Sequence, residues 1–202
     1  MRLLLSAAVI SLCASSAFAE VKGEIGLTVG QADVEVTGLL TANGDFDTFD
    51  FHAIIPVADQ FGLYVSHGTL DGNIGGVSAD GSSTVFAVGY QFLDTMDRNA
   101  STGAQMLVGL GVISSESTIG ALTTSDDTGV VIGRVTGYLG PKIRGSLSFV
   151  ADTDDFDPTF AIGLGYEAGP GILELGYSAQ SDSVSGVDVK VSGFTFGYTM
   201  EF

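Results

Sequence analysis

Apolar and polar residues alternate with a period of two along most of the chain. In the segment 84–92 the large apolar residues fall on every second position, and small or polar residues fill the positions between them. The same alternation returns in 104–112, 160–166 and 194–202. A period of two places successive side chains on opposite faces of an extended strand, and no segment repeats apolar residues at helical spacing. The pattern therefore predicts an all-β protein.

The alternation divides the chain into ten candidate strands, joined by connections that are in turn short and long. The candidate strands are 22–37, 45–57, 61–70, 83–93, 102–113, 128–139, 142–150, 158–167, 171–180 and 187–202. Short turns at one rim, longer polar loops at the other and spans of about 9–11 residues are typical of outer-membrane barrels. We predict a closed antiparallel transmembrane β-barrel, of ten strands or alternatively eight, with both termini at the periplasmic rim.

The two faces of the strands separate this fold from a soluble sandwich or barrel, which also has alternating strands. Pairing Gln91 with Gln105, and Gly165 with Glu174, places polar residues inside and the large apolar residues outside. A soluble barrel would bury its large residues and expose its charges. The faces therefore favour a barrel that is surrounded by lipid.

Toward the longer loops, the alternation of apolar and polar residues changes its phase. Val34 and Val36 are out of phase with the apolar residues earlier in the first strand, which predicts a bulge or an exit from the membrane. The longest polar stretches, Thr37–Asp50 and Ser114–Thr128, are the expected sites of surface contact.

Composition and charge exclude several classes of function. The chain carries 24 acidic against 7 basic residues, a net charge of −17, which argues against nucleic acid because phosphates need a basic face. Its single Cys excludes an intrachain disulfide framework and a thiolate zinc site. A hydrophobic content of 45% argues against disorder. Nothing in the composition calls for a cofactor.

The amino terminus has the form of a secretory signal peptide over residues 1–19. Arg2 supplies the positive charge, Leu3–Leu12 the apolar run, and Ala17–Ala19 a small-residue cleavage site. Residues 20–202 are then the barrel domain.

The last strand, 193–202, resembles the terminal strand of bacterial outer-membrane β-barrel proteins. Phe202 matches the aromatic last residue of that family, and Tyr198 and Met200 match its alternating apolar positions. The chain is similar in pattern to small porin-like or OmpA-like barrels, although no motif selects a subfamily. The resemblance implies a place in the outer membrane among lipid and lipopolysaccharide, and recognition of these three residues by the barrel assembly machinery. It also implies a non-enzymatic role, as a narrow pore or as a surface-interaction or structural scaffold, with a small solute or surface ligand that the sequence does not identify.

Four charged residues are expected on the inner face: Glu24, Arg134, Arg144 and Glu174. Charges inside a protein are retained when they are paired, so these residues predict an ion-pair cluster in the lumen. The many inward glycines have two interpretations, curvature of a small barrel or free volume for water and solute. Eight strands are just filled by side chains, so a ten-stranded lumen is expected to be plugged or very narrow.

An enzyme is the alternative from another class. Asp50, His52 and Ser66 fall on one face, and these residue types serve nucleophilic catalysis in lipid- or peptide-hydrolysing enzymes. However, the spacing along the strand places Asp50 about 7 Å from His52, and no oxyanion donor is recognisable. We therefore predict no catalytic residues and no enzymatic activity.

The segment Asp152–Asp157 is the most acidic loop of the chain. Alternating Asp residues can supply oxygen ligands to a hard cation, but the glycine and the bidentate glutamate of an EF-hand are missing. A solvated acidic loop without a metal ion is the simpler interpretation.

Overall fold

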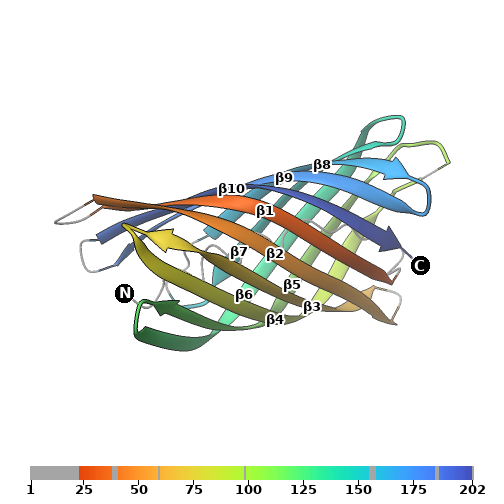
Figure 1. The fold of residues 1–202 in the computed structure, drawn as a ribbon. Coiled ribbons are helices and arrows are strands. Elements are labelled where there is room, and N and C mark those ends of the chain that lie inside the picture. The colour runs from red at the N-terminus through yellow and green to blue at the C-terminus, as the bar shows by residue number, and fades with distance from the viewer. Residues whose placement is uncertain are drawn as a thin grey trace.

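The structure is a computed structural model, and it describes residues 23–37, 41–58, 60–97, 99–154, 158–184 and 187–201. The chain forms ten antiparallel strands that close into one barrel (Figure 1). The strands are β1 Glu24–Thr37, β2 Thr41–Ala58, β3 Phe61–Ile74, β4 Val77–Asp94, β5 Ala104–Ile119, β6 Leu122–Gly140, β7 Ile143–Asp152, β8 Pro158–Ala168, β9 Gly171–Val184 and β10 Val187–Glu201. The described residues include no helix long and apolar enough to cross a membrane.

Each strand pairs with its neighbours in sequence, and β1 pairs with β10 to close the sheet. The predicted closed barrel of ten strands is thus confirmed, and the alternative of eight is wrong. The predicted signal peptide, 1–19, lies outside the described residues, so its assignment stays a prediction.

The strands are strongly tilted. A path of paired residues that leaves β6 at Tyr138 and passes once around the barrel returns to β6 at Asp126, twelve residues away. With about 3.3 Å per residue and about 4.8 Å between strands, this offset corresponds to a tilt of about 40°. That tilt lies within the range of transmembrane barrels.

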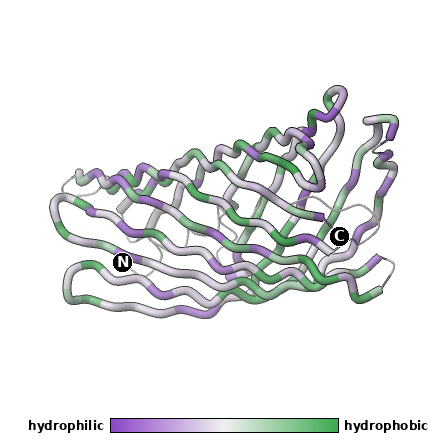
Figure 2. The backbone as a smooth tube through the Cα atoms, turned by 45° about the vertical axis from the view of Figure 1, so that its right-hand side comes forward, coloured by the Kyte–Doolittle hydropathy of each residue, from purple (hydrophilic) through white to green (hydrophobic). Residues whose placement is uncertain are grey.

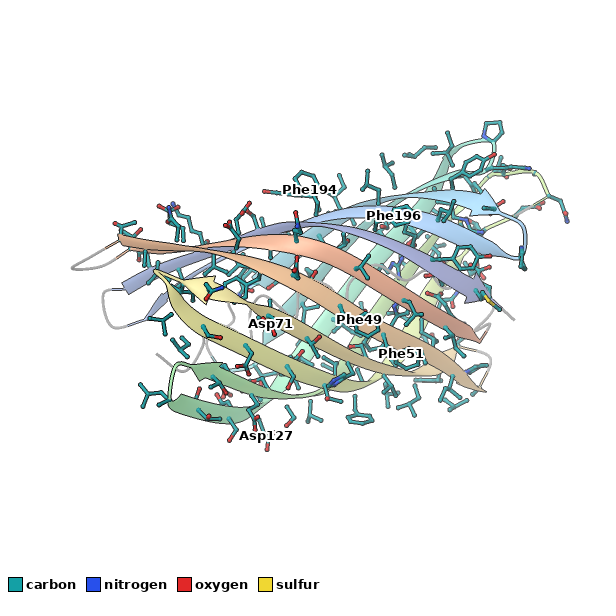
Figure 3. All side chains as sticks on the ribbon, in the orientation of Figure 1. Phe49, Phe51, Asp71, Asp127, Phe194 and Phe196 are labelled. Atoms are coloured by element: carbon teal, nitrogen blue, oxygen red, sulfur yellow. The ribbon has the colours of Figure 1, made fainter. Side chains whose placement is uncertain are left out.

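An apolar belt surrounds the outside of the barrel, and every strand contributes at least one large residue to it. Phe49, Phe51, Phe194 and Phe196 show its aromatic part (Figure 3). The apolar segments gather toward the end of the barrel that holds the carboxyl terminus (Figure 2). A continuous apolar surface of this extent is unfavourable in water, so the belt is the lipid-facing surface.

Where the strands leave the belt, the outward positions become polar and the inward positions become apolar. In β1, Val29 points outward and is 53% exposed, whereas Val34 points inward and is 3% exposed. The outward positions beyond Val29 are Gln31, Asp33 and Glu35. Because β1 keeps one continuous register with both neighbours, the predicted bulge is wrong, and the change of phase marks the exit from the membrane.

The projecting part has its own apolar interior, here called the upper core. It consists of Ala32, Val34, Phe46, Leu70, Ala79, Val189 and Val191. At a tilt of about 40°, the segment 31–37 rises about 18 Å above the belt. Apolar residues inside and polar residues outside are the arrangement of a soluble barrel, because water surrounds this part.

Two predicted loops are therefore strands. β3 continues to Ile74 and β4 begins at Val77, with Gly75 and Gly76 forming a tight turn at positive φ. In the same way the stretch 114–127 lies mostly within β5 and β6. Their Ser, Thr and Asp residues suggested loops, but residues such as Asp71, Asp80 and Ser114 occupy the hydrated outer face of strands that project beyond the lipid, whereas Ser115 and Ser117 point inward and are buried.

Candidate functional site

The inner face of the barrel carries two groups of charged side chains. The first, here called the mouth cluster, lies near the short turns at the end of the barrel where β1 begins and β10 ends, and consists of Tyr138, Arg144, Glu167 and Glu201. Arg144 is 4% exposed; its Nε donates to Glu167 Oε1 at 3.0 Å and its Nη1 donates to Glu201 Oε1 at 3.0 Å. Its Nη2 also contacts Glu167 and donates to the Tyr138 hydroxyl at 3.1 Å. One guanidinium thus connects β7 with three other strands, β6, β8 and β10, across the mouth.

The second group, here called the lumen cluster, consists of Glu24, Asp50, His52, Arg134 and Glu174. His52 lies between two carboxylates: its Nε2 is 3.2 Å from Glu24 Oε1 and its Nδ1 is 3.6 Å from Asp50 Oδ1. The guanidinium of Arg134 interacts electrostatically with Glu174 and Glu24. The Thr199 hydroxyl donates to Glu174 Oε2 at 3.2 Å.

The four charges expected from the sequence are divided between these two groups. Glu24, Arg134 and Glu174 lie in the lumen cluster, whereas Arg144 binds Glu167 and Glu201 instead of Glu174. Sequence reasoning missed Glu167 and Glu201 as its partners. The signal was present, because both residues alternate with outward apolar residues and therefore belong to the inner face.

The residues of the suggested assembly signal lie on the closing strand. Met200 points outward and is 51% exposed, and the Tyr198 hydroxyl donates to the Ala168 carbonyl at 3.3 Å. Phe202 lies outside the described residues, so its role stays a prediction.

The three residues of the candidate triad lie close together inside the barrel, but the histidine has a different second partner. The register pairs His52 with Ser66 as predicted, and the side chains of Asp50, His52 and Ser66 are fully buried. The expected separation of about 7 Å between Asp50 and His52 is wrong for the side chains, which turn toward each other to 3.6 Å. A nucleophilic triad needs the histidine between the serine and the aspartate, but Nε2 of His52 faces Glu24 instead.

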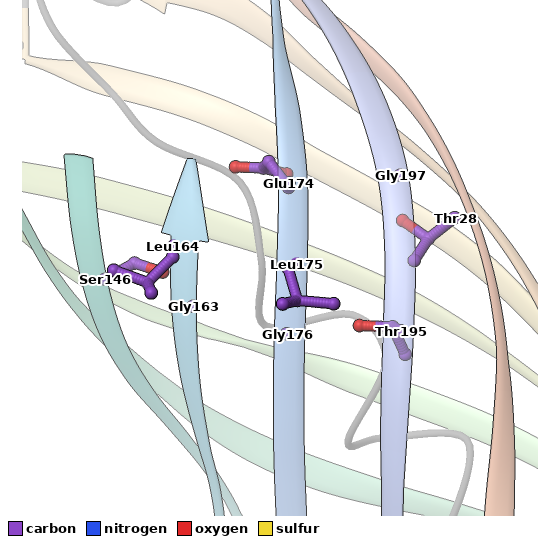
Figure 4. Close-up of a pocket in the computed structure, with 9 residues that line it drawn as sticks. All are labelled: Thr28, Ser146, Gly163, Leu164, Glu174, Leu175, Gly176, Thr195 and Gly197. Atoms are coloured by element: carbon purple, nitrogen blue, oxygen red, sulfur yellow. The ribbon is translucent and has the colours of Figure 1, made fainter. Parts of the chain in front are cut away.

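Large neighbouring side chains fill the space beside the inward glycines. A Cβ on Gly26 would lie 2.2 Å from Cε1 of His52, and a Cβ on Gly165 would lie 2.8 Å from Cγ2 of Ile172. These glycines therefore admit bulky neighbours and do not leave open volume. A cavity of about 10 Å³ remains beside Glu174 and Thr195 (Figure 4), which is room for about one water molecule.

The acidic loop is described only as far as Asp154. Asp152 Oδ1 accepts a hydrogen bond from the backbone N–H of Asp154 at 3.1 Å, which closes a local turn. In the described part of the chain, no three His, Cys, Asp or Glu side chains are placed to hold a metal ion.

Comparison with known proteins defines the fold and no narrower group. No family model and no curated protein matches the sequence. Among solved structures, the outer membrane protease OmpT from Escherichia coli is 9% identical, with a TM-score of 0.50 over 93% of this chain and 99% of OmpT. The outer membrane protein OprG from Pseudomonas aeruginosa is 12% identical, with a TM-score of 0.41 over 91% of this chain and 99% of OprG. The closed barrel and its apolar belt are those of bacterial outer-membrane β-barrel proteins.

Proposed function

We propose that the protein is a non-enzymatic outer-membrane barrel with a closed lumen, which serves as a scaffold for interactions at the cell surface. The observation that carries this proposal is the filling of the inner face at two depths. The lumen cluster occupies the membrane-embedded part, and the upper core occupies the part that projects into water.

The upper core supports closure at the outer end. Phe46 is 2% exposed, Leu70 1% and Val34 3%, so these inward side chains pack against one another and not against water. An apolar constriction resists hydration, and an ion that entered it would lose its water shell without replacement. Solute therefore has no favourable path through this level.

The lumen cluster supports closure deeper in the barrel. Its charged groups are buried and engage one another, which compensates the cost of removing them from water. A permeating ion would have to displace these interactions. The same arrangement speaks against hydrolysis, because His52 is held between two carboxylates and is not accessible to a substrate.

Planar-bilayer recording of the purified protein tests the proposal. We expect no steady conductance from the wild type. The double variant Phe46→Gly, Leu70→Gly loses the outer constriction but keeps the lumen cluster, so it should conduct only in brief events, when the lumen cluster opens. The matched control is Asp71→Gly, which changes an outward residue on the same wall. A large and steady wild-type conductance would show an open pore and contradict the proposal.

An activity assay tests the enzyme alternative separately. Lipid A or peptide cleavage by the purified protein, abolished in a folded His52→Ala variant, would favour that alternative.

A further inference from the structure

The projecting wall has a gap where β7 and β8 stop short of their neighbours. β7 ends at Asp152 and β8 begins at Pro158, and the first pair between β6 and β7 joins Val130 to Asp152. Among the residues that the structure describes, the segment 122–128 of β6 pairs with β5 alone. On the other side of the gap, Gln180 of β9 accepts a hydrogen bond from Thr159 of β8 at 2.6 Å, and the segment 181–184 pairs, within the described part of the sheet, with β10 alone. We call this gap the wall notch.

The wall notch has the width of two strands. Between the free edges of β6 and β9 lie three inter-strand spacings of about 4.8 Å, or about 14 Å in total. The rest of the projecting wall is continuous from β9 through β10 and β1 to β6. Within the residues that the structure describes, the notch is therefore the place where this wall presents strand edges without a sheet partner.

The hydrogen-bonding direction of the β6 edge follows from its last bonds to β7 and β5. The Gly129 carbonyl faces β7, because it accepts a hydrogen bond from the Thr153 N–H at 2.8 Å. The Asp126 carbonyl faces β5, because it accepts from the Ser115 hydroxyl at 3.3 Å. Backbone groups alternate in direction along a strand, so the N–H and C=O groups of Thr123 and Ser125 point into the wall notch.

The charge around the edge selects the partner. Asp126, Asp127 and Asp154 are exposed, and Asp127 lies on the outer side of the projecting part (Figure 3). The segments 122–128 and 150–160 contain no Lys or Arg. These aspartates repel an acidic strand and add little binding energy for a neutral one. A basic strand gains binding energy from charge complementarity.

We propose that the free edge of β6, residues 122–128, binds an extended basic peptide segment by strand addition. The backbone of Thr123 and Ser125 supplies the hydrogen bonds, and the aspartates around them favour Lys or Arg on the added strand. This inference deepens the proposed surface-interaction role and rests on it for the placement of the wall notch outside the membrane.

Fluorescence anisotropy with the full mature protein in detergent micelles tests strand addition. The probe is a labelled octapeptide of alternating Lys and Thr, and its controls are the Glu–Thr octapeptide and a Lys–Thr octapeptide methylated on alternate backbone nitrogens. We expect saturable binding of the Lys–Thr peptide only, since the other two lack the charge or the backbone donors.

One matched pair of variants and one double variant separate the contribution of the backbone from that of the charge. Ser125→Pro removes one edge N–H without entering the β5 ladder and should weaken binding about tenfold, while the matched Ser125→Ala should bind like the wild type. Asp126→Asn with Asp127→Asn should weaken binding at low salt and much less at high salt. Heat-modified migration on gels checks that each variant folds.

If Ser125→Pro and the wild type bind the Lys–Thr peptide with equal affinity, the binding is unspecific charge attraction, and strand addition is overturned. Absence of saturable binding to the Lys–Thr peptide would also overturn it. Both failures are distinguishable from failure of the proposed function, because that failure appears as steady conductance in the bilayer experiment and does not depend on the peptide.

Discussion

Arg144 holds the mouth cluster together, and its removal should destabilise the barrel more than removal of the whole mouth cluster. The guanidinium binds Glu167 of β8 and Glu201 of the closing strand β10, and it lies 5.1 Å from the centre of the Tyr138 ring. Arg144→Ala leaves two carboxylates close together without this cation. Loss of one partner from a buried ion pair costs about 3–5 kcal/mol, and we expect the lower end because the mouth is close to water.

The comparison variant removes the charges together. In Arg144→Met, Glu167→Gln, Glu201→Gln the same positions keep their volume, and no unpaired charge remains. Replacement of a complete buried ion cluster by neutral residues is often close to neutral in stability. We therefore expect the triple variant to unfold near the wild-type urea midpoint, and the single variant to unfold well below it.

The assay is equilibrium unfolding by urea in lipid vesicles. Far-ultraviolet circular dichroism is the suitable probe, because the chain contains no Trp. Leu147→Ala on the outer face of β7 serves as a control for substitution in the same strand. If the triple variant loses as much stability as Arg144→Ala, the reasoning from stranded carboxylates is refuted.

Three further predictions concern packing, the lipid belt and assembly. Gly26→Ala should lower the free energy of unfolding by about 1–3 kcal/mol, because the new Cβ overlaps His52. Gly140→Ala is the control and should change this free energy little, because the space at its Cβ is open. Equal effects of the two variants would contradict the packing argument. Phe196→Arg places a charge in the belt and should lower the free energy of unfolding in vesicles by about 2–4 kcal/mol. Phe196→Leu is the control. If Phe196→Arg loses no more stability than the control, lipid does not surround this position. Deletion of Phe202 should lower the heat-modifiable fraction recovered from outer membranes, and equal recovery of deleted and intact chains would refute its role in assembly.

The face of each residue could be predicted from the sequence with good accuracy. An extended chain turns its side chains alternately to opposite sides, so the period of two separates the lipid-facing Phe194 from the inward Thr195 without knowledge of any partner. The same rule predicts ten strands and polar residues inside; the strands are confirmed, but the inner face also holds a buried apolar cluster that includes Ile54, Leu107 and Ile132. The rule also places His52 and Ser66 opposite each other across a short turn.

Depth and register depended on the tertiary structure. A slip of two residues leaves every side chain on the same face, so alternation does not detect it. Gln91 was expected opposite Gln105 but pairs with Leu107, because the hairpin closes at the bridge between Asp97 and Thr102, which sets a different register. Both glutamines still point inward and are buried.

The partners of the inner charges were decided by the closed barrel itself. Arg144 and Glu201 lie 57 positions apart in sequence and meet across the mouth only when ten tilted strands are joined into a ring. The projecting wall was also decided by the tertiary structure. In the sequence its polar outward residues resemble loops. Only the position of the belt shows that they belong to strands beyond the lipid, with apolar residues on their inner face. Local alternation determines direction, whereas the tilt and closure of the sheet determine which inward residues share one level.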